Sequence, residues 1–195
     1  MNIYKLRHEV NDIPNTECGI YWFKIRFPSA YSFGIDTDVN QDQINKLIEN
    51  IYLYSNVINN INISSRVFNK NNLMLSSIFK FSFNSCEYSP QVNKIRNIIE
   101  NKSASQLLSI IKIIQNAINE LPPIYVGITE KQSFKERFDQ HFNGHTALKK
   151  GIENIGIGWD CINFVTFPQN DYDIDFHRDI EKVVHYILKP ILSKG

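Results

Sequence analysis

The stretch IYVGITEKQSFKERFDQHF, residues 124–142, decides the fold that we predict for this chain. Its first five residues are mostly apolar or β-branched, which is typical of a short buried strand. Residues 133–142 predict a helix, and the Asn-Gly pair that follows them is a common way for a helix to end. Arg137 and His141 stand at positions i and i+4, so a helix places both side chains on one face.

Two further segments are predicted to be strands, and one more is predicted to be a helix. Residues 18–27 alternate in side-chain character along a strand, and residues 161–167 (CINFVTF) form another strand. A helix is predicted over about 176–188, and Glu181 interrupts its apolar run. A carboxylate within an apolar run of a helix calls for a structural or functional explanation. The residues that we expect on the core face of this helix are Ile180, Val183, Val184, Ile187 and Leu188.

These elements predict a mixed α/β (α+β) fold. A small three-stranded, mainly antiparallel sheet (about 18–27, 123–128 and 161–167) is flanked by helices. A short return strand is expected over 31–35, after the Pro-Ser turn that ends the first strand. We expect one domain over residues 1–195, which an insertion at about 38–120 interrupts.

The insertion is predicted to be mostly helical. Isoleucine and leucine recur at helical spacing from Ile44 onward. Ser89-Pro90 begins a second helix, and Ser103 with Gln106 forms a capping box for a third. Residues 78–83 alternate and are either a strand or irregular. We see no internal repeat.

Three blocks of the chain resemble the GIY-YIG nuclease family. They are CGIYWFKI (18–25), PIYVGITEKQSFKERFDQH (123–141) and DIEKVVHYILKPILS (179–193), and they follow one another in the family's order. The restriction-enzyme branch is the most similar, because a long insertion precedes PPIYVG. The resemblance does not extend to residues 38–120. A competing match, Tyr31 to Gly34, lacks the downstream arginine and histidine, so we choose Tyr125 as the second motif tyrosine.

The resemblance implies a metal-dependent endonuclease, a hydrolase that cleaves DNA phosphodiester bonds in restriction or defence. Tyr21 is then the general base or its immediate partner, and Tyr125 positions water or phosphate. Arg137 stabilises the transition state with its guanidinium fork, and His141 relays a proton or orients a tyrosine. Glu181 is the single ligand of Mg²⁺ or Mn²⁺. No organic cofactor is implied.

Two groups of residues are expected to bind substrate. Family members commonly end the last helix with an asparagine whose amide reaches the site, and Ser193 stands at that position here with a shorter reach. Of the segments 1–40, 41–120 and 121–195, only residues 41–120 carry a net positive charge, which is +3. Either phosphate contacts lie in this insertion, or its Ile-rich faces form a homodimer. The expected phosphate contacts are Lys94, Arg96, Lys102 and Lys112.

Composition limits these expectations. The net charge of +1 argues mildly against a DNA-binding protein, because such proteins are often basic. No run of 18 apolar residues occurs, so we expect no contact with a membrane. The three cysteines are far apart, which indicates reduced thiols in a cytoplasmic protein and no structural zinc site.

Each site residue also has an ordinary structural role open to it. Tyr21 could be a packing residue, Arg137 could pair with a surface acid, and His141 could stabilise a helix end. Glu181 could pair with His185 at i+4. Two other functions therefore stay open. One is a non-catalytic nucleic-acid-binding or protein-interaction module that keeps the fold, and the other is a structural partner protein that binds through its helical insertion.

Overall fold

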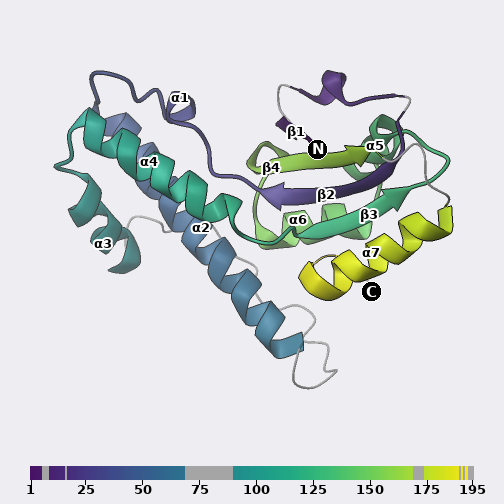
Figure 1. The fold of residues 1–195 in the computed structure, drawn as a ribbon. Coiled ribbons are helices and arrows are strands. Elements are labelled where there is room, and N and C mark those ends of the chain that lie inside the picture. The colour runs from purple at the N-terminus through teal and green to yellow at the C-terminus, as the bar shows by residue number, and fades with distance from the viewer. Residues whose placement is uncertain are drawn as a thin grey trace. The chain divides into compact units, whose positions relative to one another are not determined.

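The computed structural model describes residues 1–5, 9–15, 17–68, 90–168, 174–188, 190 and 192. The chain divides into two compact units. Unit 1 joins Met1–Arg26 to Asn119–Gly195, and unit 2 is Phe27–Ile118. Figure 1 shows the helices and strands of both units.

Unit 1 contains a four-stranded antiparallel sheet in the order β1-β4-β2-β3. The mixed α+β class is confirmed, but the expected number of three strands is wrong. The missed strand, β1, pairs Ile3 with Val165, almost the whole chain length away. Its four residues carry no turn signal that would announce a neighbouring strand. The strands are β1 (Asn2–Lys5), β2 (Gly19–Ile25), β3 (Tyr125–Thr129) and β4 (Ile162–Pro168).

Helices flank this sheet, as expected. The α-helices of unit 1 are α5 (Phe134–Asn143), α6 (Ala147–Ile155) and α7 (Ile174–Leu188). Short 3-10 turns lie at η1 (Val10–Asp12) and η3 (Trp159–Cys161). Aromatic side chains of α5 pack on one face of the sheet, where the Phe138 ring centroid lies 5.5 Å from that of Phe164 and 6.4 Å from that of Phe23. This aromatic core holds α5 in place.

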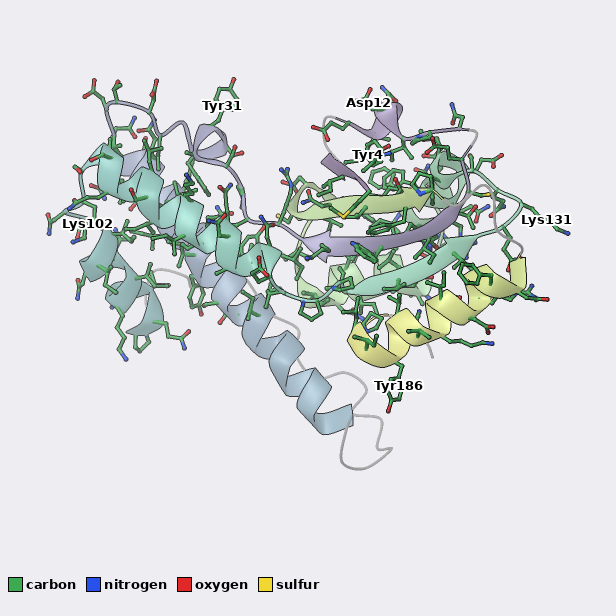
Figure 2. The ribbon with its side chains drawn as sticks, viewed as in Figure 1. Tyr4, Asp12, Tyr31, Lys102, Lys131 and Tyr186 are labelled. Atoms are coloured by element: carbon green, nitrogen blue, oxygen red, sulfur yellow. The ribbon has the colours of Figure 1, made fainter. Side chains whose placement is uncertain are left out.

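Helix α7 lies beside β3, the edge strand of the sheet (Figure 1). The prediction of its core face is wrong in part, because the side chains of Val183 and Ile187 are 56% and 68% exposed. Figure 2 shows Tyr186 projecting from α7 away from the sheet. The helix turns polar residues toward β3, and an apolar period alone does not reveal which face of a helix meets its neighbour.

Unit 2 is helical, as predicted for the insertion. Its helices are α1 (Ala30–Phe33), α2 (Gln41–Phe68), α3 (Pro90–Ile99) and α4 (Ala104–Asn119, whose last residue belongs to unit 1). The return strand expected over 31–35 is wrong, because this segment forms α1 and ends at Gly34 in the left-handed region, with φ of 70°. The capping box of α4 is confirmed: the Ser103 amide donates to Gln106 Oε1 over 3.0 Å, and the Gln106 amide donates to Ser103 Oγ over 3.4 Å.

The Ile-rich faces of the insertion supply much of the core of unit 2. The buried apolar side chains of its helices include Leu47, Ile48, Val92, Ile99, Leu107 and Ile111. Ile98 and Ile113 are exposed instead, at 60% and 67%. A homodimer through this insertion would therefore use these outer residues, since the inner ones already pack within the unit.

Three calls from the sequence lie outside the described residues: the alternating segment 78–83, the Ser89 cap and Ser193. In the part of the chain that the structure describes, none of the helices combines the length and the apolar composition that crossing a membrane requires.

Candidate active site

Strand pairing places Tyr21 at the centre of the site. Tyr21 of β2 lies opposite Gly127 of β3 on one side and opposite Thr166 of β4 on the other. A Cβ atom at position 127 would lie 2.5 Å from Tyr21 Oη and 2.7 Å from Tyr21 Cζ. Glycine is thus required at this position so that the phenol can cross over the neighbouring strand.

Tyr125 lies on the same face of the sheet, diagonally from Tyr21. Their ring centroids are 6.2 Å apart and the planes are inclined by 28°. The two phenols differ in access to solvent, because Tyr21 is fully buried (0% exposed) whereas Tyr125 is partly exposed. Tyr125 is thus the more accessible of the two tyrosines to solvent.

Helix α5 brings Arg137 and His141 to the Tyr21 hydroxyl. The Arg137 Nε–H donates to Tyr21 Oη over 3.1 Å, and His141 Nε2 lies 2.8 Å from the same oxygen. The helix begins at a full capping box, in which the Ser133 side chain bonds the Glu136 amide and the Glu136 carboxylate bonds the Ser133 amide. This cap fixes the start of the helix four residues before Arg137.

Burial determines the protonation states of Tyr21 and His141. Burial raises the pKa of Tyr21 far above its ordinary value, and the charge of Tyr125 adds to this, while Arg137 opposes it. Burial also lowers the pKa of His141 from 6.5 to about 4, with a further contribution from the Arg137 charge. At neutral pH, Tyr21 is therefore a phenol and His141 is a neutral imidazole.

The neutral His141 has a preferred tautomer. Its Nδ1 is buried and has no hydrogen-bond partner among the described residues. A proton on Nδ1 would leave a buried N–H without an acceptor, so the proton belongs on Nε2, which donates to Tyr21 Oη. Tyr21 Oη then accepts from both His141 and Arg137.

Arg137 is oriented by Gln140 as well as by Tyr21. Its Nη1 donates to Gln140 Oε1 over 2.9 Å. The neighbouring acids do not pair with it: Asp139 binds Lys135 at 2.6 Å, and Glu136 belongs to the capping box. Burial acts against the charged guanidinium, but the Tyr21 phenol and the charges of Tyr125 and Glu181 raise the pKa of Arg137. Arg137 remains a cation at the centre of the site.

Glu181 reaches the same site from α7. Burial raises the pKa of this carboxyl and the Glu130 charge adds to the effect, whereas His185 and Arg137 oppose it. The charges of Glu181 and Arg137 of α5 thus act on each other, and Glu130, which follows β3, also acts on Glu181. Contacts bring together Tyr21, Tyr125, Arg137 and His141, from β2, β3 and α5, and Glu181 on α7 joins them through its electrostatic effect on Arg137.

The residues expected to bind phosphate lie in unit 2. Lys94, Lys102 and Lys112 are exposed, whereas Arg96 is partly buried and donates from Nη1 to Asn45 Oδ1 of α2 over 3.0 Å. The three lysines can meet a polyanion, and Arg96 is partly committed to holding α3 against α2.

Sequence reasoning missed three residues around the site: Gln140, which orients Arg137, and Glu130 and Arg178, which lie near Glu181. The i+4 neighbour of Glu181, His185, was expected as its partner, and its Nε2 lies 3.7 Å from Glu181 Oε1. A signal was also present for Gln140, three residues after Arg137, and for Arg178, three residues before Glu181. Glu130 offered no such signal, since its partner Arg178 is 48 residues away.

The carboxylates fit a magnesium ion better than a metal that needs many protein ligands. Within the described ranges, no group of three or more His, Cys, Asp or Glu side chains is placed to hold a metal ion. Mg²⁺ is commonly bound by one or two carboxylates and keeps several waters. Glu181 would supply one such carboxylate, and the Glu130 carboxylate, whose charge helps to raise the pKa of Glu181, forms an ion pair with Arg178 at 2.9 Å.

The chain was compared with protein-family models, with curated proteins and with solved structures, and none of them matches it. The case for a function rests therefore on the geometry of this site.

Proposed function

We propose that this protein is a metal-dependent endonuclease that hydrolyses DNA phosphodiester bonds, with unit 1 as the catalytic unit. One observation carries the proposal: the buried Tyr21 hydroxyl binds both Arg137 and His141, beside a solvent-reached second phenol, Tyr125. A tyrosine that served only for packing would not need two nitrogen partners and a glycine opposite its ring.

The substrate needs positive charge at the phosphate, and Arg137 is placed to supply it. Nε is used by Tyr21 and Nη1 by Gln140. Within the described part of the chain no hydrogen bond uses Nη2, so this group is left for a phosphate oxygen. Because its other two nitrogens are fixed, the guanidinium is oriented before the substrate arrives, which is the condition for strong transition-state stabilisation.

Proton removal from the attacking water falls to Tyr125. It is the partly exposed phenol of the two, and its ring centroid lies 6.2 Å from that of Tyr21. Tyr21 is then the immediate partner of the base, His141 holds Tyr21 in the right orientation, and neither touches the water.

Glu181 would hold Mg²⁺ or Mn²⁺, with Glu130 as a nearby second negative charge. When bound, such an ion supplies positive charge to the phosphate oxygens and makes a coordinated water more acidic. The chain would hold this carboxylate on α7, next to β3, the strand that carries Tyr125.

The insertion would select the target. Its exposed Lys94, Lys102 and Lys112 are suited to the DNA backbone, with Arg96 as a further contact. Outside the insertion, Ser193 stays a candidate for substrate binding on the resemblance alone. Recognition through an inserted unit fits a restriction or defence enzyme that acts in the cytoplasm.

The test is cleavage of supercoiled plasmid by the purified full chain in Mg²⁺, with EDTA as the control. We expect nicked or linear products that EDTA abolishes. Arg137→Ala should slow cleavage by about 10²–10³-fold, the usual cost of one lost transition-state donor. DNA binding without any Mg²⁺-dependent product would contradict the proposal and favour the non-catalytic binding module.

A further inference from the structure

Helix α7, which carries Glu181, is fastened to the outer edge of β3 by polar contacts. Arg178 Nε donates to Glu130 Oε1 over 2.9 Å, just after β3 ends. His185 Nε2 lies 3.3 Å from the Val126 carbonyl, within β3. Beyond the helix, the Leu192 amide donates to the Ile124 carbonyl over 2.8 Å. Helix α7 and its C-terminal extension thus run antiparallel to β3.

Polar contacts matter here because α7 has little apolar anchorage. None of its side chains that the structure describes is fully buried, and Val183 and Ile187 are mostly exposed. The rotation of the helix about its own axis is thus set by the few polar bonds on its inner face together with its half-buried apolar side chains, Ile180, Val184 and Leu188. That rotation decides whether Glu181 faces the two phenols.

Spacing along the helix puts these bonds on both sides of Glu181. Arg178, Glu181 and His185 stand at i, i+3 and i+7, which places them on one face. The Arg178 contact lies one turn before Glu181, and the His185 contact lies one turn after it. Both contacts reach back to the β3 segment.

His185 makes the more buried of the two connections. Its side chain is 18% exposed, whereas that of Arg178 is 51% exposed and is shared between Glu130 and Asp175. An exposed ion pair contributes little, while a buried donor to a backbone carbonyl holds one geometry. The carbonyl in question belongs to Val126, between Tyr125 and Gly127 of the candidate active site.

The same nitrogen also faces Glu181. His185 Nε2 lies 3.7 Å from Glu181 Oε1 and 3.3 Å from the Val126 carbonyl oxygen. Both neighbours are acceptors, so Nε2 carries a hydrogen and donates. One imidazole thus lies between the carboxylate and the backbone of the strand that carries Tyr125.

We propose that His185 is a positioning residue for Glu181, which fixes that carboxylate against β3 so that it holds a divalent cation beside Tyr125 and Arg137. The inference rests on the proposed metal site. It assigns to His185 no contact with the substrate and no proton transfer. Outer residues of this kind typically change metal affinity by about 10–100-fold when they are removed.

The test is the affinity of the metal-free full chain for Mn²⁺, measured from the electron paramagnetic resonance signal of free Mn²⁺. His185→Ala should bind Mn²⁺ about 10–100-fold more weakly than the wild type. His185→Gln should regain most of the affinity, because its side-chain amide donates from nearly the position of Nε2. The matched control is Lys182→Ala, which removes an exposed ion pair with Asp179 on the same helix and should leave the affinity unchanged.

Folding is checked by thermal unfolding of each variant. If His185→Ala unfolds too early to be titrated, His185→Asn replaces it, since this amide is polar but too short to reach the Val126 carbonyl. Equal Mn²⁺ affinity in the wild type and in His185→Ala or His185→Asn would overturn this inference alone. So would a His185→Gln variant as weak as His185→Ala. A wild type that binds no Mn²⁺ would overturn the metal site of the proposed function as well.

Discussion

The Tyr21 hydroxyl is the single group that joins three parts of the candidate active site. It accepts from Arg137, contacts His141 and interacts with Tyr125, while its ring fills the space above Gly127. Even small substitutions around this oxygen should therefore change both the stability of the protein and the rate of DNA cleavage.

Gly127→Ala tests the space that this ring needs. The added methyl group would lie 2.5 Å from Tyr21 Oη, so the phenol must move away from Arg137 and His141. We expect a loss of about 1–3 kcal/mol in the free energy of unfolding, typical of an overpacked core, together with much slower DNA cleavage. Denaturant unfolding and the plasmid assay measure both. A variant with unchanged stability and unchanged cleavage would show that the ring does not occupy this space.

His141 should make stability depend on pH. Its pKa is 6.5 in the ordinary state and about 4 in the folded protein, so on acidification the unfolded chain binds the proton first. The folded state therefore loses stability as pH falls from about 6.5 to about 4, and gains nothing from this group above that window.

The measurement is the difference in unfolding free energy between pH 7 and pH 5. His141→Gln should show a smaller loss than the wild type over this interval. His145→Gln, which changes an exposed histidine near the end of the same helix, should keep the wild-type loss. If His141→Gln behaved like the wild type, His141 would not be buried and neutral in the folded state.

At the scale of elements, the start of α5 sets where Arg137 and His141 stand. Ser133→Ala removes the cap and should cost about 1 kcal/mol of stability. Because the frayed turn carries Arg137, cleavage should fall as well. The matched control is Ser103→Ala, which removes the equivalent cap of α4 in unit 2. It should cost similar stability without slowing cleavage, and equal slowing in both variants would disprove a link between this cap and the site.

The elements also show how far the sequence alone could lead. The strand-helix segment from Tyr125 to His141 was predictable, because its strand, its cap and its i, i+4 pair are all local signals. Strand β1 was not, since four residues pair with β4 far along the chain. The orientation of α7 was predictable only in part. Ile180, Val184 and Leu188 are half-buried, but Val183 and Ile187 are exposed, and the contacts with Glu130 and the Val126 carbonyl could not be foreseen.

Local sequence patterns were equally limited in predicting the candidate active site. The grouping of Tyr21, Tyr125, Arg137 and Glu181 was expected from a resemblance in the order of motifs. The complete burial of Tyr21 was not, and it moves the contact with water to Tyr125. Burial depends on neighbours such as Phe164, 5.4 Å away between ring centroids, which no local pattern announces.

At the scale of the whole molecule, the question is what unit 2 contributes. Changing Lys94, Arg96, Lys102 and Lys112 together to neutral residues should weaken DNA binding and flatten its dependence on salt, because fewer counterions are released. Binding measured at two salt concentrations checks this. An unchanged affinity and salt slope would exclude these four residues as phosphate contacts. A protein that is dimeric whenever it is active would instead favour the exposed Ile98 and Ile113 as an interface.

The central claim is that the site on unit 1 cleaves DNA with a cation held by Glu181. Its most direct test is the rate of plasmid cleavage by Glu181→Gln in Mg²⁺, compared with that of the wild type under the same conditions. The substitution keeps the shape of the side chain and removes its charge. We predict a folded protein whose cleavage is slower by at least about 10²-fold. Cleavage by Glu181→Gln at the wild-type rate would contradict the account and place the reaction elsewhere on the chain.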